Sequence, residues 1–312
     1  MDADLKFLIY GVVSLLAFAS TVSFVLKKII GANKLINNLN SRVNAWWMMC
    51  FVFFIAILTG GIASIILFSL VSFMALREFI TMAPTNKGDH RTLFWAFFVA
   101  LPVQYIFVAI DWYGMFAIWI PVYCFLFIPI RNALSGETTR FLERTAKIQW
   151  GLMICVYCVS HVPMLLNTVV KDLDNGPIKM LFFFVLIVQL NDVFQYIWGN
   201  ILGKHKVIPK ISPNKTWEGL IGGILSTSIL GGALWWVTPF GTPYQAGFMA
   251  MIIATMGFFG DIVMSAIKRD RGIKDFSATI AGHGGILDRI DSLCFAAPIF
   301  FHFTRYFFLD YA

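Results

Sequence analysis

Long apolar runs are the feature that most restricts how this chain can fold. Ten of them lie along the 312 residues, near 7–26, 45–59, 61–76, 93–110, 112–130, 148–168, 179–198, 218–237, 247–267 and 292–309. Only 13% of the residues are charged, which is too little polar surface to cover a water-soluble protein of this size. Inside a bilayer every backbone polar group needs an internal partner, and runs without strand-like alternation meet that need as helices. The sequence therefore predicts an all-α, polytopic integral membrane protein with nine to ten transmembrane helices.

Positive charges gather in alternate loops between these runs. The basic loops are 27–44, 77–92, 131–147, 199–217 and 268–291. With ten spans, all five lie on one side of the membrane, and the opposite loops carry little charge. Because cytoplasmic loops are enriched in Lys and Arg, the pattern places the five basic loops in the cytosol and both termini outside. The net charge of +7 follows from this topology, so we expect no nucleic-acid partner.

The apolar run 247–267, which precedes the basic loop 268–291, contains an acidic residue. Asp261, Ser265, Lys268 and Arg269 are spaced i, i+4, i+7 and i+8, so they share one face of a helix. A carboxylate buried in a bilayer without a partner is costly. We therefore expect a metal ion or a cationic side chain beside Asp261.

A glycine-rich turn follows that helix. Gly284 and Gly285 allow the backbone to approach an anion closely, and Asp288 and Asp291 come next, spaced i, i+3. Acids of this kind bind Mg²⁺, which prefers oxygen ligands, while the metal and nearby cations neutralise phosphate charge. The segment therefore predicts a site for phosphoryl chemistry.

A second polar segment has the same character. Asp192 lies near the cytosolic end of its apolar run, and the loop that follows is rich in Lys, Ser, Thr and Gly. Four of its residues are candidates for substrate contacts: Lys210, Ser212, Lys215 and Thr216. We expect the two polar segments to form one site at the cytosolic end of the helices.

Together these residues resemble the signature of the phosphatidate cytidylyltransferase (CDP-diacylglycerol synthase) family. The matching pattern is Ser265-x-x-Lys268-Arg269, then Lys274-Asp275, then His283-Gly284-Gly285-x-x-Asp288-Arg289-x-Asp291. The resemblance is strong over about 190–291. Two positions depart from the family: Ala281 replaces the usual Pro or Gly, and Val193-Phe194-Gln195 follows Asp192 where bacterial members commonly have Thr-Gly-Ala.

The resemblance implies a reaction and its partners. CTP and phosphatidate would give CDP-diacylglycerol and diphosphate, as a step of phospholipid biosynthesis. It implies Mg²⁺ as the cofactor, with a second metal ion left open, and it suggests a homodimer. It also implies a multi-pass protein of the bacterial inner (cell) membrane, with the active site facing the cytosol.

The predicted roles follow from the residue types and from the resemblance. The residues predicted to be catalytic are Asp288, Asp261, Lys268, Arg269 and His283. The residues predicted to bind substrate are Lys210, Ser212, Lys215, Thr216, Ser265, Gly284, Gly285 and Arg289. The residues predicted to bind metal are Asp288, Asp261, Asp192 and Asp291.

The chain reads as one membrane domain with two parts. Residues 1–170 are predicted to form N-terminal transmembrane helices, and residues 171–312 the C-terminal catalytic region with its cytosolic motifs. Three alternatives stay open. The chain could be a CTP-dependent transferase acting on a polyprenol or an ether-lipid phosphate, because the signature does not report on acyl chains. It could be an ion-coupled transporter, because intramembrane acids also mark ion paths. It could also be a non-catalytic scaffold.

Overall fold

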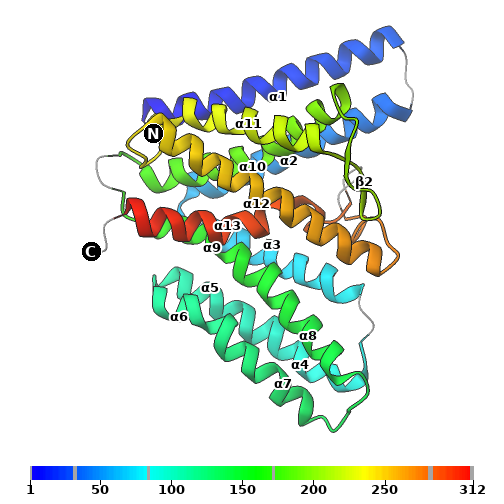
Figure 1. Cartoon of the computed structure of the whole chain (residues 1–312). Helices are drawn as coiled ribbons and strands as arrows, with labels where there is room; N and C mark the ends of the chain where they lie inside the picture. Colours follow the sequence, from blue (N-terminus) through cyan, green and yellow to red (C-terminus); the bar gives the residue numbers. More distant parts are fainter. Residues whose placement is uncertain (1, 31–33, 83–84, 171–172, 280–283, 310–312) are drawn as a thin grey trace.

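The fold is a bundle of antiparallel helices (Figure 1), seen in a computed structural model that describes residues 2–30, 34–82, 85–170, 173–279 and 284–309. Within these ranges the chain forms ten helical rods and one short β-hairpin. The first three rods are α1 (Ala3–Ile30), α2 (Lys34–Thr59) and α3 (Gly61–Thr81). The last four are α10 (Gly176–Ile201), α11 (Trp217–Ala233), α12 (Pro243–Asp270) and α13 (Leu287–Phe308).

The three middle rods are composite. Each pairs two α-helices across a π-helical stretch: α4 (His90–Trp95) with α5 (Leu101–Ala109), α6 (Tyr113–Ile118) with α7 (Phe125–Ala133), and α8 (Phe141–Gly151) with α9 (Val159–Met164). The intervening π-helical stretches are Ala96–Ala100, Trp119–Cys124 and Leu152–Cys158. Short 3₁₀ turns occupy Lys87–Asp89, Leu165–Asn167 and Trp235–Val237. Pro121 lies inside the second stretch, where its missing N–H interrupts the regular hydrogen-bond ladder.

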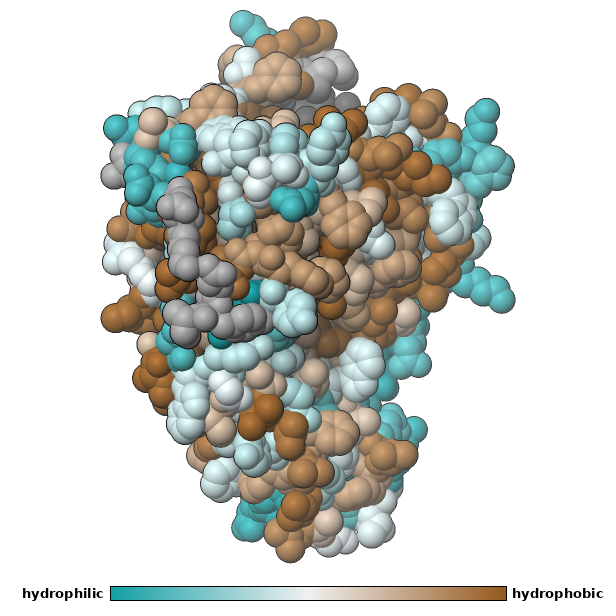
Figure 2. All heavy atoms as spheres, turned by 60° about the vertical axis from the view of Figure 1, so that its left-hand side comes forward, coloured by the Kyte–Doolittle hydropathy of each residue, from teal (hydrophilic) through white to brown (hydrophobic). Residues whose placement is uncertain are grey.

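Seven rods of the described chain are long and apolar enough to cross a membrane, and Val43–Thr59 of α2 is a shorter apolar helix. Large apolar side chains point outward around the bundle. Ile62, Leu142 and Ile229 are 76%, 79% and 73% exposed. Figure 2 shows apolar residues over much of one face, between patches of hydrophilic residues. The predicted fold class, an all-α polytopic membrane protein, is confirmed.

Local signals explain where several helices begin and end. Gly60 has a φ of 114°, a conformation that residues with a Cβ rarely adopt, and it separates α2 from α3 as the sequence predicted. Thr216 caps α11 by accepting a hydrogen bond from the Gly219 backbone N–H. Thr242 caps α12 in the same way, and Pro243 occupies the first helical position.

The two ends of the bundle differ. In Figure 1 the start of α1 and the end of α13 lie at one end, and the hairpin of β1 (Lys206–Ile208) and β2 (Ser212–Thr216) lies at the other. The strands pair antiparallel. Helices α10 to α13 pack mainly on their neighbours in sequence, and α13 also contacts α3 and α9. The signature residues of α12 and α13 therefore meet at the hairpin end.

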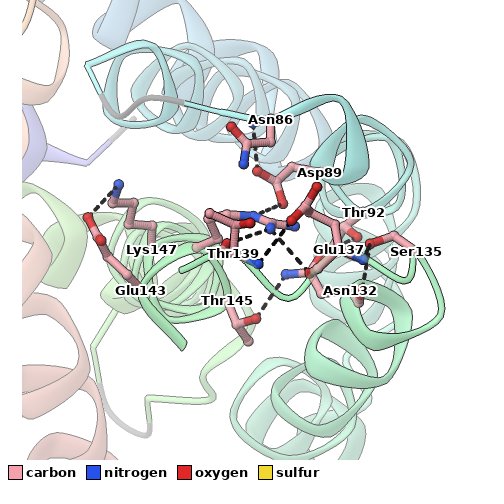
Figure 3. Close-up of polar contacts among 11 residues, drawn as sticks. Asn86, Asp89, Thr92, Asn132, Ser135, Glu137, Thr139, Glu143, Thr145 and Lys147 are labelled. Carbon is pink, nitrogen blue, oxygen red and sulfur yellow. Dashed lines mark hydrogen bonds and ion pairs between the residues drawn. The ribbon is translucent and has the colours of Figure 1, made fainter. Parts of the chain in front are cut away.

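A buried ion pair joins the middle rods near the same end. Arg144 of α8 donates from Nε to Asp89 Oδ1 at 2.8 Å, and both side chains are almost completely buried. The same guanidinium donates to the backbone oxygens of Glu137 and Thr139. Figure 3 shows this polar cluster, in which Asn132 bridges to Thr145. Removing either charge would leave the other buried without a partner, which is destabilising. We therefore interpret the cluster as a structural link between α4, α7 and α8.

Candidate active site

A polar cavity of about 350 Å³ opens at the hairpin end, between α10, β2, α11, α12 and α13. It takes residues from both polar segments of the sequence. Its lining includes Asp192, Gln195, Ser212, Asn214, Lys215, Thr216, Phe258, Asp261, Lys268, Asp275, Asp288, Arg289 and Asp291. The expectation that residues far apart in the chain form one site is therefore met in the described structure.

Asp261 lies at the centre of the first contact network. Its Oδ2 is 2.6 Å from Lys215 Nζ, and its Oδ1 accepts a hydrogen bond from Ser265 one helical turn later. Lys215 also donates to Gln195 Oε1 at 3.4 Å and lies over the ring of Phe258. The cationic partner expected for an intramembrane carboxylate is thus Lys215, which the hairpin brings back towards the membrane.

Asp288 forms a second network. Its Oδ1 is 2.7 Å from Lys268 Nζ, and its Oδ2 accepts hydrogen bonds from the backbone N–H groups of Phe276 and Gly285, both at 2.9 Å. The side chain is only 3% exposed. These three donors fix the glycine turn against α12 and leave one acceptor site, on Oδ1, for a further partner.

Glu78 at the end of α3 holds the same turn from the other side. It is 5% exposed and accepts hydrogen bonds from the backbone N–H groups of Ile286, the N-cap residue of α13, and Leu287, its first residue. The hydroxyls of Ser277 and Thr279 also donate to it, at 2.6 and 3.0 Å. A single carboxylate thus satisfies orphan donors at a helix start and fixes the loop before it.

The glycines of this turn have no space for a side chain. Gly284 has a φ of 80°, and a Cβ on Gly285 would lie 2.4 Å from Glu78 Oε2. Glu78 cannot move aside without losing its four hydrogen bonds. The sequence assigned these glycines to close approach of an anion, and in the structure the carboxylates of Asp275, Asp288 and Glu78 lie beside them.

Gly285→Ala should therefore lower stability by about 1 to 3 kcal/mol, the usual cost of overpacking, and should reduce turnover by displacing the turn. Gly61→Ala is the control, because a Cβ there meets nothing within 4 Å. Thermal melting in detergent measures the effect. Equal melting temperatures for the two variants would contradict the packing described here.

Two further acids, Asp192 and Asp291, face the cavity beside Asp261. Asp291 lies close enough to Asp192 and Asp261 for their charges to interact, and Ser292 donates its hydroxyl to Asp192 at 3.3 Å. The cavity lining contains five carboxylates but only three cationic side chains, those of Lys215, Lys268 and Arg289. An acidic cavity of this kind can admit a polyphosphate only if cations enter with it.

The donor set suits a hard cation. No group of three or more His, Cys, Asp or Glu side chains in the described residues is already arranged around one point as a metal site. Mg²⁺ does not require such a site, because it commonly binds one or two carboxylates and completes its shell with water and substrate phosphates. The residues that fit this role are Asp192, Asp261 and Asp291.

The structure gathers most of the predicted site residues. Nine of them line the cavity: Asp192, Ser212, Lys215, Thr216, Asp261, Lys268, Asp288, Arg289 and Asp291. Ser265 supports Asp261 from behind. Arg269 instead donates to the backbone oxygens of Ile211 and Ile273, and Lys210 is exposed at the hairpin turn, so neither lines the cavity. His283 lies outside the described residues.

Several residues of the site were not among those predicted to act or bind there. Asn214, Phe258 and Asp275 line the cavity, and Gln195 and Glu78 make the contacts described above. Gln195 is buried where it can contact Lys215, and its only signal was its place one turn after Asp192. Glu78 had a weak signal, as an acid at the end of an apolar run in Arg77-Glu78-Phe79. Nothing in the sequence indicated that its partners lie about 200 residues away.

Comparison with known proteins places this chain among similar sequences. A family model described as the cytidylyltransferase family matches residues 40–307. The uncharacterized protein YnbB of Escherichia coli (strain K12) is 38% identical over 268 residues, which are 85% of this chain and 87% of that protein. A phosphatidate cytidylyltransferase of Staphylococcus aureus (strain COL) is 30% identical over 256 residues, 80% of this chain and 92% of the relative. A phosphatidate cytidylyltransferase of Haemophilus influenzae is 41% identical over 145 residues, 44% of this chain and 49% of the relative.

Proposed function

Because this chain belongs to the cytidylyltransferase family, we propose that it is a phosphatidate cytidylyltransferase. The reaction joins CTP and phosphatidate to give CDP-diacylglycerol and diphosphate. The observation that carries the proposal is the polar cavity in which Lys215, Lys268 and Arg289 face Asp192, Asp261 and Asp291. This arrangement lies at the end of a membrane bundle, where a lipid phosphate and a soluble nucleotide can both reach it. The S. aureus relative, aligned along most of its length, supports the choice of substrates.

To catalyse this reaction, the protein has to position the two substrates and neutralise the charge on their phosphates. An ionised oxygen of the lipid phosphate attacks the α-phosphorus of CTP, the new P–O bond forms, and the bond to the β-phosphate bridge breaks to release diphosphate. No activated Ser or Cys is required, since the nucleophile is already anionic. Lys215, Lys268 and Arg289 are placed to offset the charge that builds up on the transferring and leaving groups.

The excess of carboxylates in the cavity supports Mg²⁺ as the cofactor. Asp192, Asp261 and Asp291 would hold it, and the bound ion would supply the positive charge that lets a triphosphate enter an acidic cavity. Asp288 and Glu78 keep the turn before α13 in place, so that Arg289 and Asp291 face the cavity. The loop charges support an active site on the cytosolic side of a bacterial inner membrane.

A lipid and metal panel tests this function. The purified protein, in detergent, is incubated with labelled CTP and either phosphatidate, a polyprenol or an archaeal-type ether-lipid phosphate, with Mg²⁺ or with EDTA. We expect a lipid-soluble cytidine product with phosphatidate that EDTA abolishes. If product forms only with another lipid, that lipid and not phosphatidate is the substrate. No nucleotide turnover with any lipid would overturn the proposal and bring the transporter and scaffold alternatives forward.

A further inference from the structure

An apolar pocket of about 320 Å³ lies beside the polar cavity and shares a residue with it. The pocket is lined from α2, α3, α10 and α13, by residues that include Cys50, Leu67, Phe68 and Leu293. Arg289 lines this pocket and the polar cavity alike. The two spaces therefore meet at Arg289, with a polar compartment on one side and an almost wholly apolar one on the other.

Arg289 has an unused donor at this junction. Its Nε is shielded from solvent and has no hydrogen-bond partner among the described residues. A buried N–H without a partner is costly, so the donor is expected to meet an acceptor when substrate binds. The pocket itself offers few acceptors. Its lining contains one amide side chain, that of Gln189, and no hydroxyl group. A phosphate oxygen bound at the boundary would supply such an acceptor.

The pocket also has the direction that a lipid requires. Along α13, Arg289 lies in the first turn and Leu293 one turn further from the hairpin end. Along α10, Asp192 lines the polar cavity, while Gln189 and Val185 line the apolar pocket progressively further from that end. At 1.5 Å per residue, the step from Asp192 to Val185 spans about 10 Å. The pocket thus runs from headgroup depth towards the middle of the bundle.

A second apolar pocket, of about 480 Å³, continues the first. It lies between α1, α2 and α10, and the two pockets share Trp46, Cys50, Phe53, Val185 and Gln189. Two adjoining apolar compartments, joined to one cationic junction, fit an amphiphile with one phosphate and two hydrocarbon chains. Apart from Arg289 and Gln189, neither lining contains a charged or amide side chain.

We infer that these pockets hold the acyl chains of the lipid substrate, and that Arg289 binds its phosphate at the boundary with the polar cavity. The inference rests on the proposed function. It adds the place where the lipid binds and the residues that contact its acyl chains. Leu67 and Cys50 are then chain-contacting residues. Lipids that merely surround the protein are the competing explanation.

Photolabelling tests the site without depending on turnover. The protein, in nanodiscs, is given phosphatidate with a diazirine on one acyl chain, irradiated, and mapped by mass spectrometry. We expect labels on pocket residues such as Cys50 and Leu67, which excess phosphatidate suppresses and phosphatidylcholine does not. Labels spread over outward-facing residues, with no competition by phosphatidate, would mean surrounding lipid only and would overturn the inference.

A matched pair of variants adds a kinetic readout. Leu67 lines the pocket, whereas Leu70 on the same helix is 59% exposed and lines neither pocket. Leu67→Trp should raise the KM for dioleoyl-phosphatidate relative to dioctanoyl-phosphatidate by roughly tenfold with kcat unchanged, and Leu70→Trp should not. Equal ratios for the two variants would contradict the inference. If excess phosphatidate suppresses the pocket labels but the protein never turns over CTP, the lipid site is supported and the proposed function is wrong.

Discussion

Asp261→Asn is expected to reduce kcat by ~10²- to 10³-fold, the size of effect that follows loss of a group acting on transition-state charge. The substitution keeps the shape of the side chain but removes its charge. Lys215, whose Nζ lies 2.6 Å from the carboxylate, would lose its ionic partner, and the cavity would lose one of the three acids that fit a metal ion. Steady-state kinetics over a range of Mg²⁺ concentrations measures the effect. We expect the Mg²⁺ concentration needed for half-maximal activity to rise as kcat falls.

Asp270→Asn is the matched control for that experiment. Asp270 ends the same helix, its side chain is 71% exposed, and its ion-pair partner is the neighbouring Arg271. It should behave as the wild-type protein does. If Asp261→Asn keeps near wild-type kcat and Mg²⁺ dependence while remaining folded, the assignment of Asp261 to the reacting phosphates is wrong.

Glu78→Gln should have the second large effect, through the shape of the site. Glutamine keeps one acceptor oxygen, but its NH₂ group would face the donors of Ile286, Leu287 or Ser277. Leaving buried donors unpaired should cost about 2 to 4 kcal/mol of stability. Because the turn carries Arg289 and Asp291 into the cavity, we also expect kcat to fall by up to ~10²-fold, as small misplacements of reacting groups commonly cause.

Hydrogen exchange separates this explanation from a general loss of folding. In Glu78→Gln the backbone amides of Ile286 and Leu287 should lose protection, whereas amides in the middle of α12 should not. Glu143→Gln is the control, because Glu143 forms surface ion pairs with Arg140 and Lys147. Unchanged protection at Ile286 and Leu287 would contradict the role assigned to Glu78.

The sequence predicted the helical rods well, because burial in a bilayer leaves a strong and local signal. The apolar run 179–198 lies inside α10 and the run 247–267 lies inside α12. The helices extend past the runs, since hydrogen bonding continues into the polar ends that periodicity does not mark. The hairpin of β1 and β2 was not predicted: it is short and polar, and it carries Lys215 to Asp261.

The site was predictable where its residues fall in compact motifs, and less so where long-range packing decides their contacts. The spacing of Asp261, Ser265 and Lys268 placed them on one helix face. In the structure Asp261 and Lys268 line the cavity, and Ser265 donates to Asp261. The same spacing could not reveal that Arg269 turns to the backbone of Ile211. Nor could it reveal that Glu78, which lies on α3 and far from the signature residues in sequence, holds the glycine turn in place. The first contact depends on how α12 packs on the hairpin and the second on how α3 packs on α13, and no local pattern encodes either.

The most direct measurement of the central claim is the fate of each phosphate of CTP. The protein, with Mg²⁺ and phosphatidate, is given CTP labelled at the α-phosphorus in one reaction and at the γ-phosphorus in another, and the lipid phase is then extracted. Cytidylyl transfer predicts that the α-label enters the lipid while the γ-label leaves in diphosphate. A γ-label in the lipid phase, with the α-label left in soluble nucleotide, would show phosphoryl transfer instead and would contradict the proposed function.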